Sequence, residues 1–290
     1  MLYINKKDTA MFDICNGVKQ EENSVCINVS DGCITKYLPR GFRDIWLSFD
    51  TCITKSLNSL AADIFVAFDD DHKENIRLWS NNPLRLPTGT GQNTTKIEFN
   101  NNWVQDDVWC TIRIHAWIDE SDSTKLHFTA YNDGKVMVEN VIATTTNGAK
   151  FKDFFSIGFA KESSSFIYIK DIIISDKFFG ESAKIKEIPI TQIKNWTKNP
   201  DTGQYYASKT NQQGTLVIDP LLLADLEKYD IVSTAINGIM TREGEDIKNL
   251  EITVGDKTIN QNLVYGNNRL SVDIGNDLSL LSNISVETKG

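Results

Sequence analysis

The chain has 290 residues, of which 40% are hydrophobic and 24% charged, and its formal net charge is −9. At about 100–200 residues per domain this length predicts two domains, and the ordinary composition indicates packed cores. The acidic balance, with no cluster of Lys or Arg, argues against nucleic acid or an anionic membrane surface as a partner. No apolar run approaches the roughly 20 residues that span a bilayer, so no membrane insertion is expected.

The N-terminal residues run directly into strand-like sequence and lack the regions of a secretory signal. The cysteines are odd in number and form no CxxC pair, which favours reduced, mostly buried thiols over disulfides or metal ligands. They are Cys15, Cys26, Cys33, Cys52 and Cys110.

Strand patterns dominate the first 178 residues, and polar turn sequences separate them. No helical pattern interrupts them, so an antiparallel β-sandwich is expected. The predicted strands are residues 24–29, 45–53, 63–68, 75–79, 96–99, 108–119, 125–131, 135–141, 154–159 and 165–175.

The stretch 108–119, VWCTIRIHAWID, alternates strictly between two faces. One face is small and apolar, which is typical of a half-buried antiparallel strand. The other face carries Arg113, His115 and Trp117 in place of simple solvated charges. The stretch 125–131 alternates in the same way, and the sequence Asn132-Asp133-Gly134 after it predicts a short hairpin.

Four segments in this order resemble a known fold family. They are VW at 108–109, YNDGK at 131–135, FSIGF at 155–159 and YIKDIIIS at 168–175. The order is similar to that of the concanavalin A-like, laminin-G-type jelly roll, and the resemblance covers about residues 1–178. It implies an all-β sandwich for residues 1–180 more firmly than it implies a function.

Residues 186–290 are expected to form a smaller β-rich domain that serves in docking or oligomerisation. Its clearest helix is predicted to begin at Asp219-Pro220, because Asp is a good N-cap and Pro suits the first helical position. Strand patterns then return at residues 231–240, 250–254, 258–264, 270–274 and 280–286.

The face opposite the predicted core of the first domain is the candidate ligand site. Aromatic rings can stack on sugars, while Arg and His can hydrogen-bond hydroxyl groups. The alternative is that this face is covered by other segments or by another subunit. The predicted ligand-binding residues are Trp46, Trp79, Arg113, His115, Trp117, His127 and Tyr131, with Trp103 on a neighbouring loop.

No catalytic residue is predicted. Hydrolases of this fold carry a Glu-x-Asp-x-x-Glu strand motif, and the nearest segment, residues 117–122, has the wrong spacing. The oxygen-rich loop around Asp69, Asp70, Asp71 and His72 offers ligands for calcium, although a solvated hairpin tip is the preferred interpretation. No other cofactor is expected, since no phosphate loop or HExxH motif is present.

An adhesive sandwich without a secretion signal suggests a particle that assembles in the bacterial cytoplasm and leaves by lysis. The expected function is therefore a non-enzymatic structural component of a bacteriophage or tail-like particle, located in the virion, that binds host surface glycan. The expected partners are cell-surface carbohydrate, other particle subunits and further copies in a homo-oligomer. The alternatives are a purely structural particle protein, or a glycan hydrolase or lyase on the same sandwich.

Overall fold

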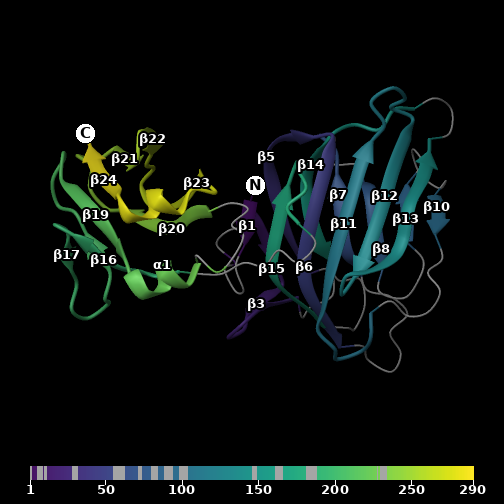
Figure 1. Cartoon of the computed structure of the whole chain (residues 1–290), viewed down its shortest axis with the longest axis horizontal. Coiled ribbons are helices and arrows are strands. Elements are labelled where there is room, and N and C mark those ends of the chain that lie inside the picture. The colour runs from purple at the N-terminus through teal and green to yellow at the C-terminus, as the bar shows by residue number, and fades with distance from the viewer. Residues whose placement is uncertain are drawn as a thin grey trace. The chain divides into compact units, whose positions relative to one another are not determined.

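The computed structural model (Figure 1) forms two compact units, Met1–Ile185 and Lys186–Gly290, called here the first and the second unit. The fold is all-β, as predicted from the strand patterns. The structure describes residues 2–4, 9, 12–27, 32–54, 63–70, 74–79, 84–87, 94–97, 104–145, 149–160, 166–180, 188–226, 228 and 234–290.

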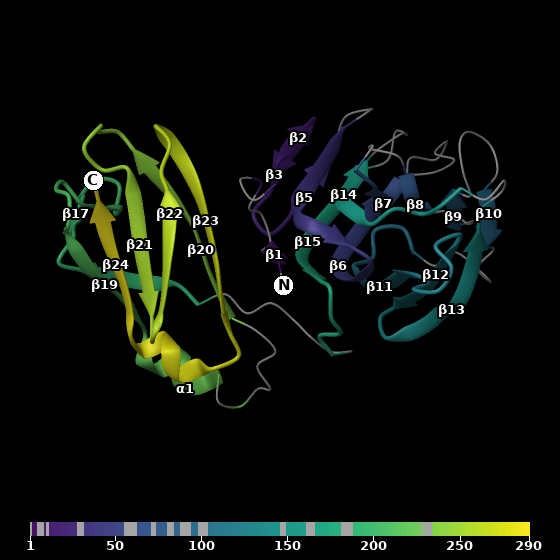
Figure 2. The ribbon, with the colours of Figure 1, turned by 90° about the horizontal axis from the view of Figure 1, so that it is seen from above.

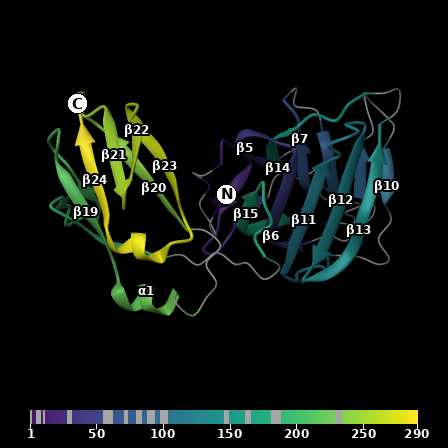
Figure 3. The same cartoon turned by 45° about the horizontal axis from the view of Figure 1, so that its top comes forward.

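The first unit is an antiparallel β-sandwich of an eight-stranded and a seven-stranded sheet. Figure 3 shows the central strands of the eight-stranded sheet side by side. In order its strands are β13 (Lys135–Thr144), β12 (Lys125–Asn132), β11 (Cys110–Ile118), β6 (Asp44–Thr54), β15 (Phe166–Ser175), β4 (Val25–Ile27) and β3 (Val18–Gln20), with β1 (Leu2–Ile4) paired to β15.

The second sheet of the sandwich lies behind the first in Figure 1. In order its strands are β10 (Thr94–Ile97), β9 (Leu84–Pro87), β8 (Glu74–Trp79), β7 (Asp63–Phe68), β14 (Phe154–Ala160), β5 (Cys33–Phe42) and β2 (Ile14–Asn16).

Strict alternation in β11 builds the core of this sandwich, as predicted. Cys110, Ile112, Ile114, Ala116 and Ile118 are all buried, with exposures of 7% or less. Because successive side chains point to opposite faces, the residues between them lie on the outer face of the sheet.

The hairpin between β12 and β13 is also confirmed. Asp133 and Gly134 have φ angles of 46° and 76°, as a two-residue turn that twists with its strands requires. The carboxylate of Asp133 accepts a hydrogen bond from the backbone N–H of Thr111 at 2.9 Å, which ties the turn to the start of β11.

The second unit packs a five-stranded sheet against a two-stranded one around a core of its own, and Figure 2 shows the unit from above. The larger sheet is β16 (Ile190–Lys194), β19 (Gln213–Ile218), β24 (Ile284–Lys289), β21 (Asn249–Val254) and β22 (Lys257–Asn262); β20 (Thr234–Arg242) pairs with β23 (Gly266–Gly275), and β17 (Thr197–Lys198) with β18 (Tyr205–Tyr206). A short 3-10 helix, η2 (Leu278–Ser282), precedes β24.

The predicted helix is α1 (Pro220–Leu226). The Asp219 carboxylate accepts a hydrogen bond from the N–H of Leu221 at 2.9 Å, which is the N-cap interaction expected from the sequence. Proline at the first helical position removes no helical hydrogen bond, since an N–H group there would have no partner inside the helix. Among the described residues no helix is long and apolar enough to cross a membrane.

Candidate active site on the outer face of the eight-stranded sheet

Four of the predicted site residues form one continuous stack of rings, called here the ring ladder: Trp46, His115, Trp117 and His127. Ring centroids lie 3.7 Å apart for Trp46 and His115, and 4.2 Å apart for His115 and Trp117. Trp117 and His127 are 4.8 Å apart, and all three pairs are stacked within 21° of parallel.

Strand register explains the ladder. His115 of β11 lies opposite Trp46 of β6, and Trp117 lies opposite His127 of β12. His115 and Trp117 are two residues apart on one strand and therefore share a face. Cross-strand neighbours on one face come close enough for rings to touch, so the pairing register assembles the ladder.

The ladder changes what the two tryptophans can offer a ligand. Each inner ring face is covered by the next ring, and Phe178 packs on Trp46 with centroids 4.8 Å apart. The rings of Trp46 and Trp117 are half-buried. A sugar therefore meets ring edges along this ladder, whereas stacking requires an open ring face.

Both histidines of the ladder are paired with aspartates. Nε2 of His115 lies 3.0 Å from Oδ1 of Asp44. Nε2 of His127 lies 3.4 Å from Oδ2 of Asp119, and its Nδ1 lies 2.8 Å from Oδ1 of Asn140. His127 is thus held at both nitrogens, whereas the carboxylate of Asp44 orients His115 through Nε2, and no described residue makes a hydrogen bond to Nδ1 of His115.

Asp119 is a fixed anion. The hydroxyl of Ser121 donates to its Oδ1 at 2.6 Å, and the N–H groups of Ser121 and Asp122 donate to the same oxygen at 2.8 and 3.0 Å. The Ser121 side chain, the Ser121 and Asp122 N–H groups and His127 lower the pKa of Asp119 to about 2. A carboxylate with this pKa carries no proton at neutral pH and cannot act as a general acid.

Arg113 and Tyr131 complete the central part of this face. They are directly opposed on β11 and β12, and Arg113 faces Ser48 on the other side. Arg113 is only 6% exposed and Tyr131 is half-buried. The guanidinium thus places a buried positive charge on the outer side of the sheet. Tyr131 is a diagonal cross-strand neighbour of His115.

A second aromatic contact, between Trp109 and Lys170, lies toward the start of β11, and it was not predicted from the sequence. Nζ of Lys170 sits 4.3 Å from the ring centroid of Trp109, which is 41% exposed. Asp50, opposite Thr111, accepts a hydrogen bond from the Thr111 hydroxyl at 2.7 Å. Lys170 could have been found from the alternation of β15, which gives it the phase of the outer face.

Two predicted residues do not belong to this face. Trp79 is on β8, where it pairs with Asp63 of β7, so it lies in the other sheet. The alternation of a strand reveals which residues share a face but not which sheet the strand joins. Trp103 lies outside the described residues.

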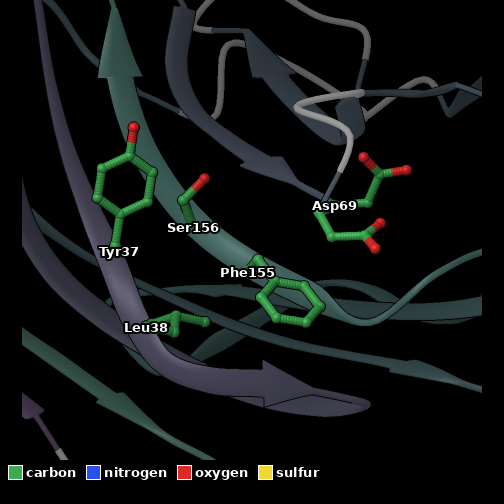
Figure 4. Close-up of a pocket in the computed structure, with 6 residues that line it drawn as sticks. Tyr37, Leu38, Asp69, Phe155 and Ser156 are labelled. Atoms are coloured by element: carbon green, nitrogen blue, oxygen red, sulfur yellow. The ribbon is translucent and has the colours of Figure 1, made fainter.

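Asp69 and Asp70, which follow β7, line a pocket on the seven-stranded sheet, drawn in Figure 4. The pocket is lined by Tyr37, Leu38, Asp69, Asp70, Phe155 and Ser156. The carboxylate of Asp70 is 2.9 Å from Nζ of Lys152, so a lysine supplies the positive charge there. No group of three or more metal-ligating side chains occurs within the described part of the chain, and Asp71 and His72 fall outside it. Calcium at this loop stays the less favoured interpretation of the sequence, after a solvated hairpin tip.

No family model and no curated protein sequence matches the chain. An endo-β-1,4-glucuronan lyase from Trichoderma reesei is 12% identical, with a TM-score of 0.45 over 61% of this chain and 96% of that one. The cellulose-induced protein Cip1 is 12% identical over 61% and 98%, with a TM-score of 0.44. Trypanosoma rangeli sialidase is 11% identical over 62% of this chain and 31% of that one, with a TM-score of 0.46.

These comparisons contradict two expectations from the sequence. A non-enzymatic bacteriophage component was predicted, yet the similar structures include a glucuronan lyase, a sialidase and an alginate lyase. The bacteriophage assignment rested on a missing signal sequence and a fold resemblance, and the non-enzymatic assignment rested on a missing pair of catalytic carboxylates. Since the identities are 12% or less, the chemistry has to be argued from this chain's own side chains.

Proposed function

We propose that the first unit is a carbohydrate-active enzyme that cleaves a uronate-containing polysaccharide by elimination, at the outer face of the eight-stranded sheet. One observation carries the proposal. The His115–Asp44 pair, with Nε2 and Oδ1 3.0 Å apart, lies next to the cross-strand pair of Arg113 and Tyr131 on the same face of the sheet. His115 can act as a base, Arg113 supplies a positive charge and the Tyr131 hydroxyl can act as an acid, and the three residues lie on two adjacent strands.

Elimination next to a carboxylate uses each of these groups. His115 takes the proton from the sugar carbon that bears the carboxylate, and Asp44 stabilises the imidazolium that forms. Arg113 stabilises the negative charge that develops on the carboxylate. Tyr131 protonates the departing glycosidic oxygen. The C–H and C–O bonds break, a C=C bond forms, and the proton on His115 returns through solvent to the tyrosinate.

The spacing suits one sugar ring. His115 and Tyr131 are diagonal neighbours on paired strands, because Tyr131 lies opposite Arg113 and His115 lies opposite Thr129. Diagonal positions are separated by about 7–8 Å between backbone positions, and the side chains narrow this distance. A sugar held over the edge of the ring ladder can therefore present one carbon to each residue.

Hydrolysis fits the same face less well. It needs two carboxyl groups, of which one must carry a proton when the reaction begins. Asp119 has a pKa of about 2 and is bound by four donors or ring nitrogens. Asp44 is engaged by His115. Asp44 and Asp119 therefore serve the histidines, and Asp50, the third carboxylate described on this face, is bound by the Thr111 hydroxyl. Elimination is the reaction that uses the histidines directly.

The full chain should be assayed on polyglucuronate, alginate and polygalacturonate, following the ultraviolet absorbance of the unsaturated product and the release of reducing ends. We expect both signals on at least one polymer. The variant His115→Ala should lower the rate about 10²–10⁴-fold, the usual contribution of a general base. Phe166→Ala, at a 39% exposed ring of the same sheet, is the matched control and should leave the rate unchanged.

Two outcomes of this assay would contradict the proposal. Reducing ends without ultraviolet absorbance would mean hydrolysis and would contradict the proposal. No signal on any of the three polymers, with a correctly folded chain, would also overturn it. Homo-oligomer formation remains a separate prediction, to be measured by light scattering on the same preparation.

A further inference from the structure

Strands β22 and β23 of the second unit are labelled in Figure 2. The turn between them carries two exposed apolar side chains, called here the tyrosine tip: Val264 and Tyr265. They are 66% and 74% exposed, next to Leu263, which is 7% exposed and packs in the core. Single exposed apolar residues are ordinary on a protein surface, but two in succession on one turn need a reason.

The backbone of the tip is held rigidly. The side chain of Asn268, only 7% exposed, accepts a hydrogen bond from the N–H of Val264 at 2.7 Å. Its amide nitrogen donates to the carbonyls of Val264 and Gly266 at 2.8 and 2.9 Å. Nη1 of Arg242 donates to the carbonyl of Leu263 at 2.8 Å. Two side chains thus fix the turn from the inside, and the tyrosine ring stays in solvent.

A preorganised ring suits ligand binding, because little conformational entropy is lost when a ligand arrives. Tyr also loses few rotamers for the area it offers, and its open ring face can stack on a sugar. A turn held by a buried asparagine would not need an exposed tyrosine for its own stability, since the hydrogen bonds do not involve the Tyr265 side chain.

The surroundings indicate the chemistry of the ligand. Residues 258–268 contain no Lys, Arg, Asp or Glu, although 24% of the whole chain is charged. They include Asn260, Asn262 and Asn267, which are exposed, and the half-buried Gln261. Side-chain amides offer both donors and acceptors, as hydroxyl groups require, and they carry no charge that would select an ion.

We infer that the tyrosine tip is a binding site for a neutral, hydroxyl-rich polysaccharide. Tyr265 supplies the stacking face and the neighbouring amides supply hydrogen bonds to hydroxyl groups. The second unit then attaches the chain to a neutral glycan. This inference does not depend on the proposed elimination reaction, because the tip belongs to the other unit and to another ligand class.

Native gels cast with hydroxyethylcellulose or with galactomannan test the inference on the full chain. We expect at least one polymer to retard the native protein, with little change on adding salt. The groups offered to the ligand, the Tyr265 ring and the side-chain amides, are uncharged, and the guanidinium of Arg242 donates to the carbonyls of Leu263, Gly244 and Glu245. Tyr265→Ala should weaken retardation about 10-fold, as expected for the loss of a central contact ring. Tyr265→Trp should preserve it.

Tyr206→Ala is the matched control, because Tyr206 is 50% exposed in the same unit but lies on β18, which pairs with β17 in a separate sheet. The inference is overturned if neither polymer retards the native chain, if Tyr265→Ala is retarded like the native chain, or if Tyr206→Ala weakens retardation as strongly. Gels cast with alginate provide the charged comparison. Retardation by alginate alone, if salt removes it, would also overturn the inference. His115→Ala should bind normally in these gels, so failure of the proposed enzyme function would be distinguishable.

Discussion

The ring ladder and the tyrosine tip use aromatic side chains in opposite ways. In the ladder each ring covers its neighbour, and the closest centroids are only 3.7 Å apart. At the tip a single ring, that of Tyr265, is 74% exposed and the polar contacts lie beneath it in the backbone. Rings that cover one another fix the positions of the groups between them, whereas an isolated ring keeps its face for a ligand.

The difference suggests that the ring ladder positions reacting groups, whereas the tyrosine tip binds a polysaccharide. His115 is held between two indoles and oriented by Asp44, which favours chemistry at a fixed nitrogen. Tyr265 has no ring neighbour among the described residues, and its turn is fixed instead. Substitutions in the two regions should therefore change different measurements.

The largest effect is expected from separating the histidine from its carboxylate. Asp44→Asn keeps the size of the side chain but removes the charge that stabilises the imidazolium, so elimination should slow by at least about 10²-fold. Tyr265→Phe should leave the rate unchanged. Rates on the most active uronate polymer would check both, and an Asp44→Asn enzyme with native activity would remove Asp44 from the mechanism.

The next effect concerns stability. Ile114 is fully buried on the core side of β11, between the outward residues Arg113 and His115. Ile114→Ala should lower the free energy of unfolding of the first unit by about 2–5 kcal/mol, because it removes buried methyl groups and leaves a cavity. Calorimetry should show a lower transition for the first unit and an unchanged one for the second. A shift in both would show that the units unfold together.

A smaller loss is expected at the tip. Asn268→Ala removes a buried side chain that satisfies the N–H and carbonyl of Val264. The free energy of unfolding of the second unit should fall by about 1–3 kcal/mol, the cost of leaving buried polar groups without partners. Gel retardation by neutral polymer should weaken as well, because the tyrosine loses its fixed turn. Stability loss with unchanged retardation would show that rigidity does not matter for binding.

Much of this arrangement follows from alternation in the sequence, and some of it does not. The pattern of β11 alone separated the core-facing row from the outward-facing Arg113, His115 and Trp117, and the β12–β13 turn was evident from Asp133-Gly134. Alternation could not show that the rings stack on each other, because ring orientation depends on cross-strand register.

The same limit explains the misplaced and missing residues. Trp79 has a suitable phase, but its strand joins the other sheet, and sheet membership depends on contacts distant in the sequence. Asp44 was overlooked because it is the first residue of its strand, where a solvated turn is the simpler interpretation. Its place two residues before Trp46 puts it on the same face, which is the signal that could have identified it.

The smallest expected effect compares two similar aspartates, one in each unit. Asp119 accepts hydrogen bonds from the side chain and backbone of Ser121, and Asp277 accepts the same two from Ser279. Both aspartates have a lowered pKa, led by the serine hydroxyl, and that of Asp119 is about 2. His127 contacts only the first of them.

A lowered pKa in the folded state means that ionised Asp119 favours folding above its ordinary pKa of 3.8, and that this contribution is lost as the pH falls toward 2. Asp119→Asn should therefore lower the unfolding temperature of the first unit at pH 5, and the difference from the native chain should shrink between pH 4 and about 2. Asp277→Asn should act in the same direction on the second unit only. A constant difference at every pH would mean that Asp119 acts through packing, and its charge would then have no part in holding His127.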